Sequence, residues 1–561
     1  MNDTDLITRI YSNFRGVDFR GEEINLVRSP DALNVWKDYK ETDSIRTRPA
    51  MEIFSNFQDT VHGIYFYKAG TTDMCIVHSG THLFKIVDGA KTSLCTVSDT
   101  PSNAFIFNNI WYFKDGVNYL QYDGSTVSNV VGYIPTTSIG RKPSGGGTVH
   151  EDVNLLSSYR TNTFIGDGES CDYYLDAKDI NTISEIKING ETQPLSSIRV
   201  LSQAEGRVTF SSPPPAPSTD GQDNISITYI KIVSGYPDKI KNCTLLQVFD
   251  NRVFFSGNKD FPNTVWHCSL NDPTYCSDLD YYNEGLDTAE VKGLVAGNNA
   301  LWVFREPSES NTSVFYHTPT IDSDYGKVYP NTHSTVSTGC IGKAINFNDD
   351  IVFFSNRGME GITGDITTEQ AIAHRSSLVD RKLIAEANYK DMILEEWDGN
   401  LLVIIGSNIY LADSRATFEN ENHFEYEWFY WTLNKEITCT KVHNGILYLG
   451  TSDGVYTLTD TASNVESYWT TPKDKFKYPH KLKTTNKRGC VAEATGDISV
   501  YAKVEDTDFE LIGTYENITD YFVSRIKRKK LKDIQLKFYS PSRFSLETVT
   551  LECYISSYIK R

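Results

Sequence analysis

A short segment of the chain reads Phe105-Ile106-Phe107-Asn108-Asn109-Ile110-Trp111-Tyr112-Phe113. Two apolar stretches flank a pair of asparagines, and such pairs readily adopt the positive φ angles of a two-residue hairpin turn. The segment therefore predicts a β-hairpin whose strands are apolar enough to be buried.

The same pattern recurs along the chain, with turn pairs at Asp250-Asn251, Asn348-Asp349, Asp398-Gly399 and Asn444-Gly445. The copies start roughly 45 to 50 residues apart over much of the chain, a period that fits a four-stranded propeller blade. The pattern thus predicts an all-β fold with a propeller of about seven blades, although six or eight also fit. The predicted blades start near Val61, Ala104, Leu245, Val291, Ala344, Met392 and Cys439.

Composition agrees with a strand-rich fold. The chain has 33 Tyr, 28 Phe and 8 Trp against only 5 Met, and aromatic residues are enriched in strands. At 561 residues the chain is too long for one hydrophobic core, so we expect about two to four domains.

The hairpin pattern disappears between residues 138 and 242. Short strands such as Ile186-Lys187-Ile188 and Ile225-Ser226-Ile227-Thr228-Tyr229 replace it, which predicts a small β-sandwich inserted between two blades. Glycine-rich Ser144-Gly145-Gly146-Gly147 reads as a flexible linker at its entry. The predicted domains are an N-terminal arm or closing segment (1–50), first blades (51–137), an inserted β-sandwich (138–242), remaining blades (243–470) and a C-terminal β-domain (471–561).

Charge is unevenly distributed. Residues 471–561 carry 18 Lys and Arg against 12 Asp and Glu, whereas residues 1–470 carry 36 against 61. An acidic body argues against a nucleic-acid binder, because phosphate neutralisation needs clustered Lys and Arg. An acidic wall could instead let DNA slide past.

The basic C-terminal region contains two runs. One extends from Lys473 to Arg488; the other carries the candidate partner-docking residues Arg525, Lys527, Arg528, Lys529, Lys530 and Lys532. Three interpretations remain open for them: solvated strands or loops, docking on an acidic partner subunit, or contact with DNA phosphates. The alternation that follows, from Ile534 to Tyr539, predicts a strand, so the charges belong to a folded β-domain.

The N-terminal segment has two interpretations. Residues 11–50 carry five arginines among aromatic and turn residues, which suits an arm packed on another surface. The segment could equally complete the propeller by pairing with its last blade.

No catalytic, cofactor or metal motif is present. Ser144-Gly145-Gly146-Gly147 lacks the Lys-Ser/Thr of a P-loop, and no Gly-x-Ser-x-Gly elbow occurs. His78 and His82 are four residues apart but in a predicted hairpin, so they do not predict a zinc pair. We therefore expect a protein that is not an enzyme, with no catalytic residues, cofactor or metal. No apolar run approaches the roughly 18 residues of a membrane helix, and the N-terminus shows no secretory signal.

Three stretches carry a family resemblance: Asn13-Phe14-Arg15-Gly16-Val17-Asp18 with the Arg28 to Pro49 region behind it, Asn251 to Asn258 with Pro262 to Tyr275 behind it, and the inserted sandwich. They resemble virion proteins of tailed bacteriophages, of the tail-nozzle and packaged-DNA-stabilisation type. The resemblance spans most of residues 10 to 460 and rests on fold motifs.

The resemblance implies a structural subunit of the tail or neck. Such a subunit would form a ring of six copies below the portal. The ring would extend or close the DNA ejection channel, contact portal or adaptor and tail-fibre proteins, and let double-stranded DNA pass without sequence-specific binding. It would be found in the virion, after assembly in the bacterial cytoplasm.

The alternative function is a receptor- or glycan-binding propeller. Trp428, Tyr430 and Trp431 could stack on sugar if the strand that holds them were exposed. A strand packed on both faces explains the same residues.

Overall fold

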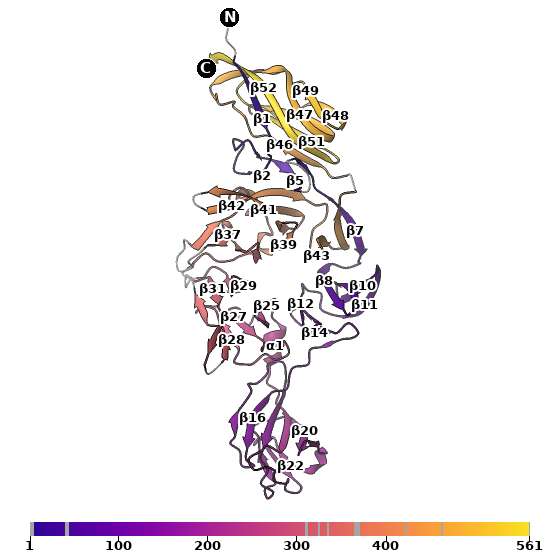
Figure 1. The fold of residues 1–561 in the computed structure, drawn as a ribbon, viewed down its shortest axis with the longest axis vertical. Helices are drawn as coiled ribbons and strands as arrows, with labels where there is room; N and C mark the ends of the chain where they lie inside the picture. Colours follow the sequence, from indigo (N-terminus) through magenta and orange to yellow (C-terminus); the bar gives the residue numbers. More distant parts are fainter. Residues whose placement is uncertain are drawn as a thin grey trace.

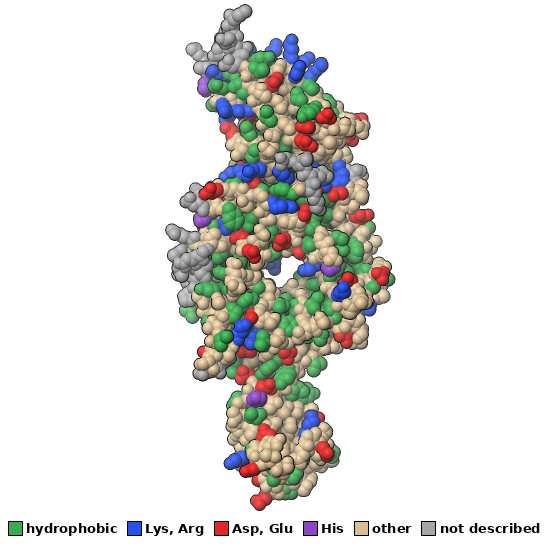
Figure 2. Space-filling view, in the orientation of Figure 1, with side chains coloured by type: hydrophobic (Ala, Val, Ile, Leu, Met, Phe, Trp, Pro, Cys, Tyr) green, Lys and Arg blue, Asp and Glu red, His purple; other side chains and the backbone are tan. Residues whose placement is uncertain are grey.

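The computed structural model describes residues 5–39, 44–308, 312–323, 326–333, 336–363, 371–420, 423–461 and 464–559. Almost all regular structure is β. Three parts follow one another along the long axis: a C-terminal sheet, a ring of small sheets with an opening at its centre, and an inserted domain at the opposite end (Figures 1 and 2).

The ring consists of seven four-stranded antiparallel sheets within the described residues. The blades are β8 (Val61–Ala69), β9 (Thr72–Ser79), β10 (His82–Val87) and β11 (Ala90–Thr96); β12 (Asn103–Phe107), β13 (Ile110–Lys114), β14 (Tyr119–Tyr122) and β15 (Val127–Asn129); β25 (Leu245–Phe249), β26 (Arg252–Ser256), β27 (Thr264–His267) and β28 (Tyr281–Asn283); β29 (Val291–Gly297), β30 (Ala300–Arg305), β31 (Val314–His317) and β34 (Asn331–His333); β35 (Ala344–Phe347), β36 (Asp350–Ser355), β37 (Gly358–Ile362) and β38 (Ile372–His374); β39 (Ile393–Trp397), β40 (Asn400–Ile405), β41 (Asn408–Asn420) and β42 (His423–Thr432); β43 (Cys439–His443), β44 (Ile446–Gly450), β45 (Gly454–Thr459) and β7 (Ala50–Asn56). A small hairpin, β32 (Thr320–Asp322) and β33 (Gly326–Val328), projects from the fourth blade.

The first strands of the blades close a ring. β8, β12, β25, β29, β35, β39 and β43 each contact the next, and β43 returns to contact β8. The predicted propeller is confirmed, with seven blades rather than six or eight in the described chain. The hairpin turns also form as predicted, because Asn108 and Asn109 have φ angles of 49° and 61°.

The last blade is completed from the other end of the chain. β7 pairs with β45, from Gly454 opposite Asn56 to Thr459 opposite Ala50. The strand that closes the ring therefore begins at the last residue of the predicted segment 11–50 and lies in residues 50–56, which the sequence assigned mainly to the first blades.

The inserted domain packs a six-stranded sheet on a three-stranded sheet around one core. The larger sheet has the order β17 (Thr148–Val149), β16 (Thr136–Arg141), β18 (Tyr159–Phe164), β24 (Ile225–Ile230), β20 (Thr182–Ile188) and β21 (Glu191–Thr192); the smaller contains β19 (Asp172–Tyr174), β23 (Arg207–Phe210) and β22 (Ile198–Ser202), preceded by the 3-10 turn η1 (Leu195–Ser197).

The glycine-rich stretch is not the entry linker that composition predicts. Residues 144–147 connect β16 to β17, which pair through Ser138 and Val149. Gly145, Gly146 and Gly147 all have positive φ, so they form the turn of a hairpin inside the domain.

The domain is attached firmly to the ring. Asn154 is fully buried and donates to the carbonyls of Tyr133 and Thr274 at 2.8 and 2.9 Å. The exit helix α1 (Tyr236–Lys241) ends against Lys114 of the second blade, whose Nζ donates to the Ile240 carbonyl at 2.6 Å. Burial lowers the pKa of Lys114 to about 8.

The C-terminal sheet contains eleven strands and is not built from residues 471–561 alone. β46 and four N-terminal strands join it. Its members are β1 (Asp5–Tyr11), β4 (Ala32–Leu33), β5 (Val35–Lys37), β6 (Ile45–Thr47), β46 (Ser467–Thr470), β47 (Lys481–Val504), β48 (Glu510–Ile518), β49 (Tyr521–Ser524), β50 (Lys529–Leu531), β51 (Ile534–Ser540) and β52 (Phe544–Ile559).

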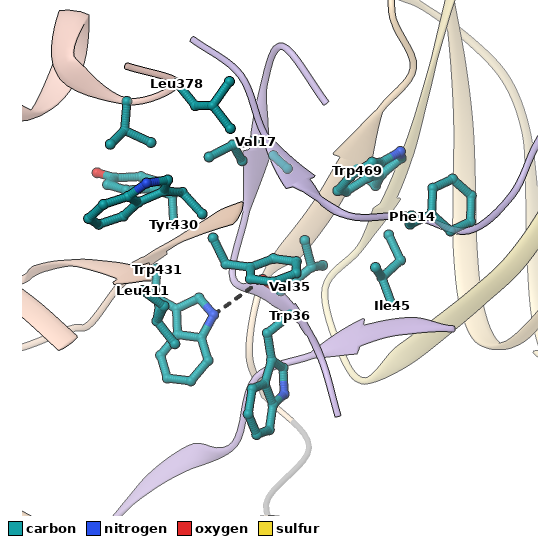
Figure 3. Close-up of a cluster of buried hydrophobic side chains, with 14 of the residues drawn as sticks. Phe14, Val17, Val35, Trp36, Ile45, Leu378, Leu411, Tyr430, Trp431 and Trp469 are labelled. Atoms are coloured by element: carbon teal, nitrogen blue, oxygen red, sulfur yellow. Dashed lines mark hydrogen bonds between the residues drawn. The ribbon is translucent and has the colours of Figure 1, made fainter. Parts of the chain in front are cut away.

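The N-terminal segment also packs between this sheet and the propeller. One continuous core includes Phe14, Val35 and Trp36, Trp431 of β42, and Trp469 of β46 (Figure 3). Trp431 Nε1 donates to the Val35 carbonyl at 3.2 Å. The short parallel pair β2 (Gly16–Val17) and β3 (Arg28–Ser29) lies against β42. The segment is thus packed on another surface, as one of the two interpretations has it, and the shared core fixes the sheet to the sixth blade.

Candidate functional site

The predicted docking residues lie along one edge of β47. β48, β49 and β50 follow one another there, while β51 and β52 pair with the other edge. Ile526 and Leu531 are buried and hold the basic segment to the sheet. Between these two anchors the charged side chains turn outward.

Five of the six predicted cations are exposed: Arg525, Lys527, Lys529, Lys530 and Lys532. Arg528 is half-buried and pairs with Glu510. The other five form no ion pair within the described part of the chain. Figure 2 shows Lys and Arg side chains projecting from the end of the molecule that this sheet forms.

An apolar row continues the basic segment along β49, and sequence reasoning missed it. Phe522, Ser524 and Ile526 point inward and are buried, whereas Tyr521 and Val523 point outward and are 63% and 45% exposed. The outward row of Tyr521, Val523, Arg525 and Lys527 combines ring, aliphatic and cationic groups. Exposed aromatic groups and arginine are enriched at protein interfaces, and the flanking lysines add charge that an acidic partner could complement.

The first basic run differs from the second because its charges are used within the chain. Lys473 pairs with Asp506 at 3.0 Å, and Lys475 pairs with Glu23. Lys483 is buried, and its Nζ donates to the carbonyls of Tyr478 and Lys532 at 2.5 Å. Lys477, Lys487 and Arg488 of the first run are exposed and form no ion pair among the described residues, but the second run holds more such cations, five against three, within eight residues.

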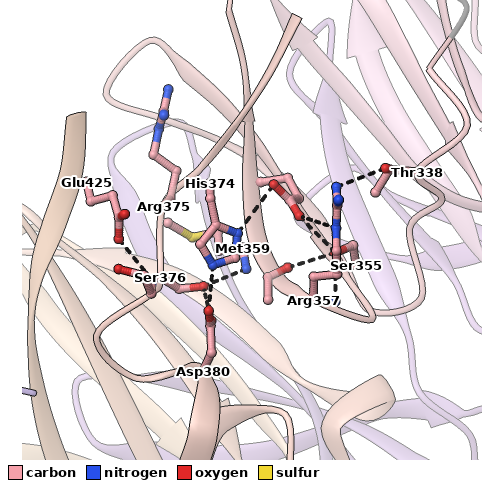
Figure 4. Close-up of polar contacts among 12 residues, drawn as sticks. Thr338, Ser355, Arg357, Met359, His374, Arg375, Ser376, Asp380 and Glu425 are labelled. Carbon is pink, nitrogen blue, oxygen red and sulfur yellow. Dashed lines mark hydrogen bonds and ion pairs between the residues drawn. The ribbon is translucent and has the colours of Figure 1, made fainter. Parts of the chain in front are cut away.

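A polar cluster on the fifth blade has the residue types of a catalytic centre. His374 lies between Asp380, at 2.5 Å from Nε2, and Glu360, at 3.4 Å from Nδ1, and Arg357 contacts Glu360 at 3.2 Å (Figure 4). These residues line a hollow of about 490 Å³.

The electrostatics of this cluster argue for a structural role. Burial alone would lower the pKa of His374, but the hydrogen bonds to Asp380 and Glu360 outweigh it and raise the pKa to about 10. A histidine held protonated at neutral pH cannot accept a proton as a general base. The cluster thus ties β37 and β38 to the short helix α2 (Asp380–Leu383), with the 3-10 turn η3 (Tyr389–Asp391) following it.

The aromatic residues considered for sugar stacking are buried. Trp428 and Trp431 are fully buried and Tyr430 is 6% exposed, because β42 packs against β38 of the fifth blade and against the N-terminal strands β2, β4 and β5. Sugar stacking at this strand is therefore wrong, and packing on both faces is the correct explanation.

The two histidines at predicted hairpin positions do not form a metal pair. His78 is buried, with Nδ1 near Ser102 Oγ at 2.8 Å and Nε2 near the Gly80 carbonyl at 2.9 Å. In the described ranges, no group of three or more His, Cys, Asp or Glu side chains is placed to hold a metal ion. None of the described helices has the length and apolar character needed to cross a bilayer.

Comparisons with known proteins add no function. No protein-family model matches the sequence, and no curated protein matches it. Similar solved structures include the computationally designed Ika8 protein (TM-score 0.33, 10% identity, covering 73% of this chain and 99% of that one) and BamB from Moraxella catarrhalis (0.34, 10%, 74% and 99%). Another is the AfRom2 CNH domain (0.24, 9%, 65% and 98%). At these TM-scores the likenesses carry no argument, so the architecture rests on the sheets themselves.

Proposed function

We propose that this chain is a structural subunit of a tailed-bacteriophage tail or neck, as the family resemblance implies, and that it docks on its neighbours through the segment from Tyr521 to Lys532. The observation that carries the proposal is the outward row on β49 and the adjoining loop. Five cations without ion pairs among the described residues lie next to two exposed apolar side chains, and this combination favours an acidic protein partner over free solvent.

The shape of the chain supports a scaffolding role. The C-terminal sheet and the sixth blade share one core, so a force on the docking surface is transmitted to the propeller without a flexible joint. In the proposed assembly several copies, six by the resemblance, form a ring that contacts the portal or adaptor and other tail proteins.

The charge of the body supports passage of DNA rather than binding. Residues 1–470 carry 36 Lys and Arg against 61 Asp and Glu. In the proposed ring this surface repels the phosphates of a passing duplex and keeps it from adhering, over a screening length of about 8 Å at physiological salt. The proposal fails if the wall of the assembled channel is basic.

The test uses purified protein and portal-containing particles of the phage that encodes it. Bound protein is measured after the particles are sedimented. The test variant combines Lys527→Glu, Lys529→Glu and Lys530→Glu. The matched control combines Lys68→Glu, Lys259→Glu and Lys390→Glu, which reverse three exposed charges on the propeller.

The test variant should lose at least tenfold in apparent affinity, because like charges facing each other across an interface cost several kcal/mol. The control should bind as the wild type does. Absence of wild-type binding, or equal binding by the test variant, would contradict the proposal.

A further inference from the structure

The outer face of the six-stranded sheet in the inserted domain carries a polar floor that opens to solvent among the described residues. Its opposite face packs into the domain core through Phe164, Ile186 and Ile227, all fully buried. The core behind the sheet therefore holds the floor in place before any ligand arrives. A preformed surface of this kind lowers the conformational-entropy cost of binding.

Strand register arranges this floor in two rows across three adjacent strands. Thr161 of β18 lies opposite Thr228 of β24, which lies opposite Glu185 of β20. Thr163, Ser226 and Lys187 form the second row in the same way. Because side chains alternate between the two faces of a sheet, all six point to the outer face.

Walls turn the floor into two adjoining hollows of about 690 and 420 Å³, which share Lys187 and Ser226. Apolar groups form part of the wall of the larger hollow: Tyr159, Ile134 and Leu195 are 37%, 42% and 49% exposed. Amides and hydroxyls complete the lining, from Gln193, Gln222, Asn189, Ser218 and Thr192.

The charge of the lining excludes a polyanion. Lys187, the one cation of the two hollows, pairs with Glu185 at 2.7 Å. A second carboxylate, Asp223, accepts the Thr163 hydroxyl and the Gly140 backbone N–H. Nucleic acid needs uncompensated cations along its path, and none lines these hollows. An extended peptide would add at a strand edge, where backbone groups are free, whereas these hollows lie on a face.

The lining presents many hydrogen-bond donors and acceptors, and apolar side chains lie at the rim of the larger hollow. The Thr161 and Thr228 hydroxyls lie 3.0 Å apart, and hydroxyls, amides and carboxylates alternate around them. A ligand that presents many hydroxyls of its own, together with apolar C–H surfaces, matches both features.

We propose that this face binds an oligosaccharide chain that is neutral overall. The site lies at the end of the molecule opposite the C-terminal sheet (Figure 1), so it can be occupied while the docking segment is engaged. The inference does not depend on the proposed virion function.

The test uses the full-length protein. An oligosaccharide array is probed first, followed by titration calorimetry with linear hexasaccharides of glucose, mannose and N-acetylglucosamine, and with a 20-base-pair DNA duplex. Ser226→Phe places a ring on the floor that the two hollows share, and Tyr159→Ala removes the rim ring. Ser128→Phe makes the same change at an exposed position of β15 and is the matched control.

We expect the wild type and Ser128→Phe to bind neutral glycans with equal affinity. The dissociation constant should rise at least tenfold in Ser226→Phe and severalfold in Tyr159→Ala, with both variants retaining the wild-type melting temperature. The inference is overturned if the array retains no wild-type protein, if Ser226→Phe binds as tightly as the wild type, or if the DNA duplex binds in place of glycans.

Discussion

Removal of the Arg28 guanidinium should release the N-terminal segment from the sixth blade. Arg28 Nε and Nη2 donate to the two carboxylate oxygens of Glu427 at 2.8 and 2.7 Å, and Glu427 is fully buried. A second partner, Arg15, reaches Glu427 at 3.3 Å with a side chain that is 47% exposed. In Arg28→Ala, Glu427 keeps only this weaker contact, and breaking a buried pair by removing one partner costs about 3–5 kcal/mol.

Hydrogen exchange read by mass spectrometry measures this cost locally, without assuming that a multidomain chain unfolds in one step. Peptides that cover β3 to β5 should exchange about 100- to 4,000-fold faster in Arg28→Ala, since each 1.4 kcal/mol corresponds to tenfold. The double variant Arg28→Met with Glu427→Leu leaves no buried unpaired charge, since the Arg15 side chain that loses Glu427 is 47% exposed, and should exchange more slowly than the single variant. The reasoning would be refuted if Arg28→Ala exchanged within threefold of the wild-type rate. It would also be refuted if the double variant exchanged faster than Arg28→Ala.

Three further predictions concern other contacts. Gly16→Ala would place a Cβ 2.2 Å from the Trp428 carbonyl oxygen, so thermal unfolding should show a loss of about 2 kcal/mol or more; an unchanged melting temperature would contradict the packing. Lys114→Ala removes a donor from the Ile240 and Lys241 carbonyls and leaves a cavity in the core, and should cost about 3 kcal/mol in denaturant unfolding; a loss below 1 kcal/mol would argue against this. His374, with its pKa raised to about 10, stabilises the folded state fully below the unfolded value of about 6.5 and progressively less up to pH 10. The melting-temperature difference between wild type and His374→Gln should thus shrink from pH 7 to pH 10.5, and a constant difference would exclude this role.

The propeller could be predicted because its signal is local. Each hairpin can be recognised by a pair of turn residues that tolerate positive φ and lie between two apolar strands, as at Asn108 and Asn109. The C-terminal sheet is different, because Leu6 pairs opposite Tyr554 and Ala32 opposite Trp469. Pairing between opposite ends of a chain leaves no pattern within either segment.

The candidate site was predictable in part for a similar reason. A run of lysines and arginines is visible in sequence, and its exposure follows from the cost of burying charge. Which alternate set of Tyr521 to Lys527 faces outward depends on the register with β47, which sequence does not reveal. Lys483 is the opposite case, a buried lysine in a basic run, because its ammonium donates to the nearby Tyr478 carbonyl and to the carbonyl of Lys532 on another strand connection.

Composition was misleading where tertiary contacts override it. Gly145 to Gly147 would be flexible as an isolated segment, but strands on both sides fix them in a turn. Trp428 and Trp431 suggested a contact surface, and the N-terminal segment covers them instead.

The virion proposal is tested most directly by the mass of the purified protein in solution, measured by light scattering alone and after mixing with portal-containing particles. The account predicts a ring of several copies, or capture of the chain by the particles. A monomer that remains free in the presence of the particles would contradict it.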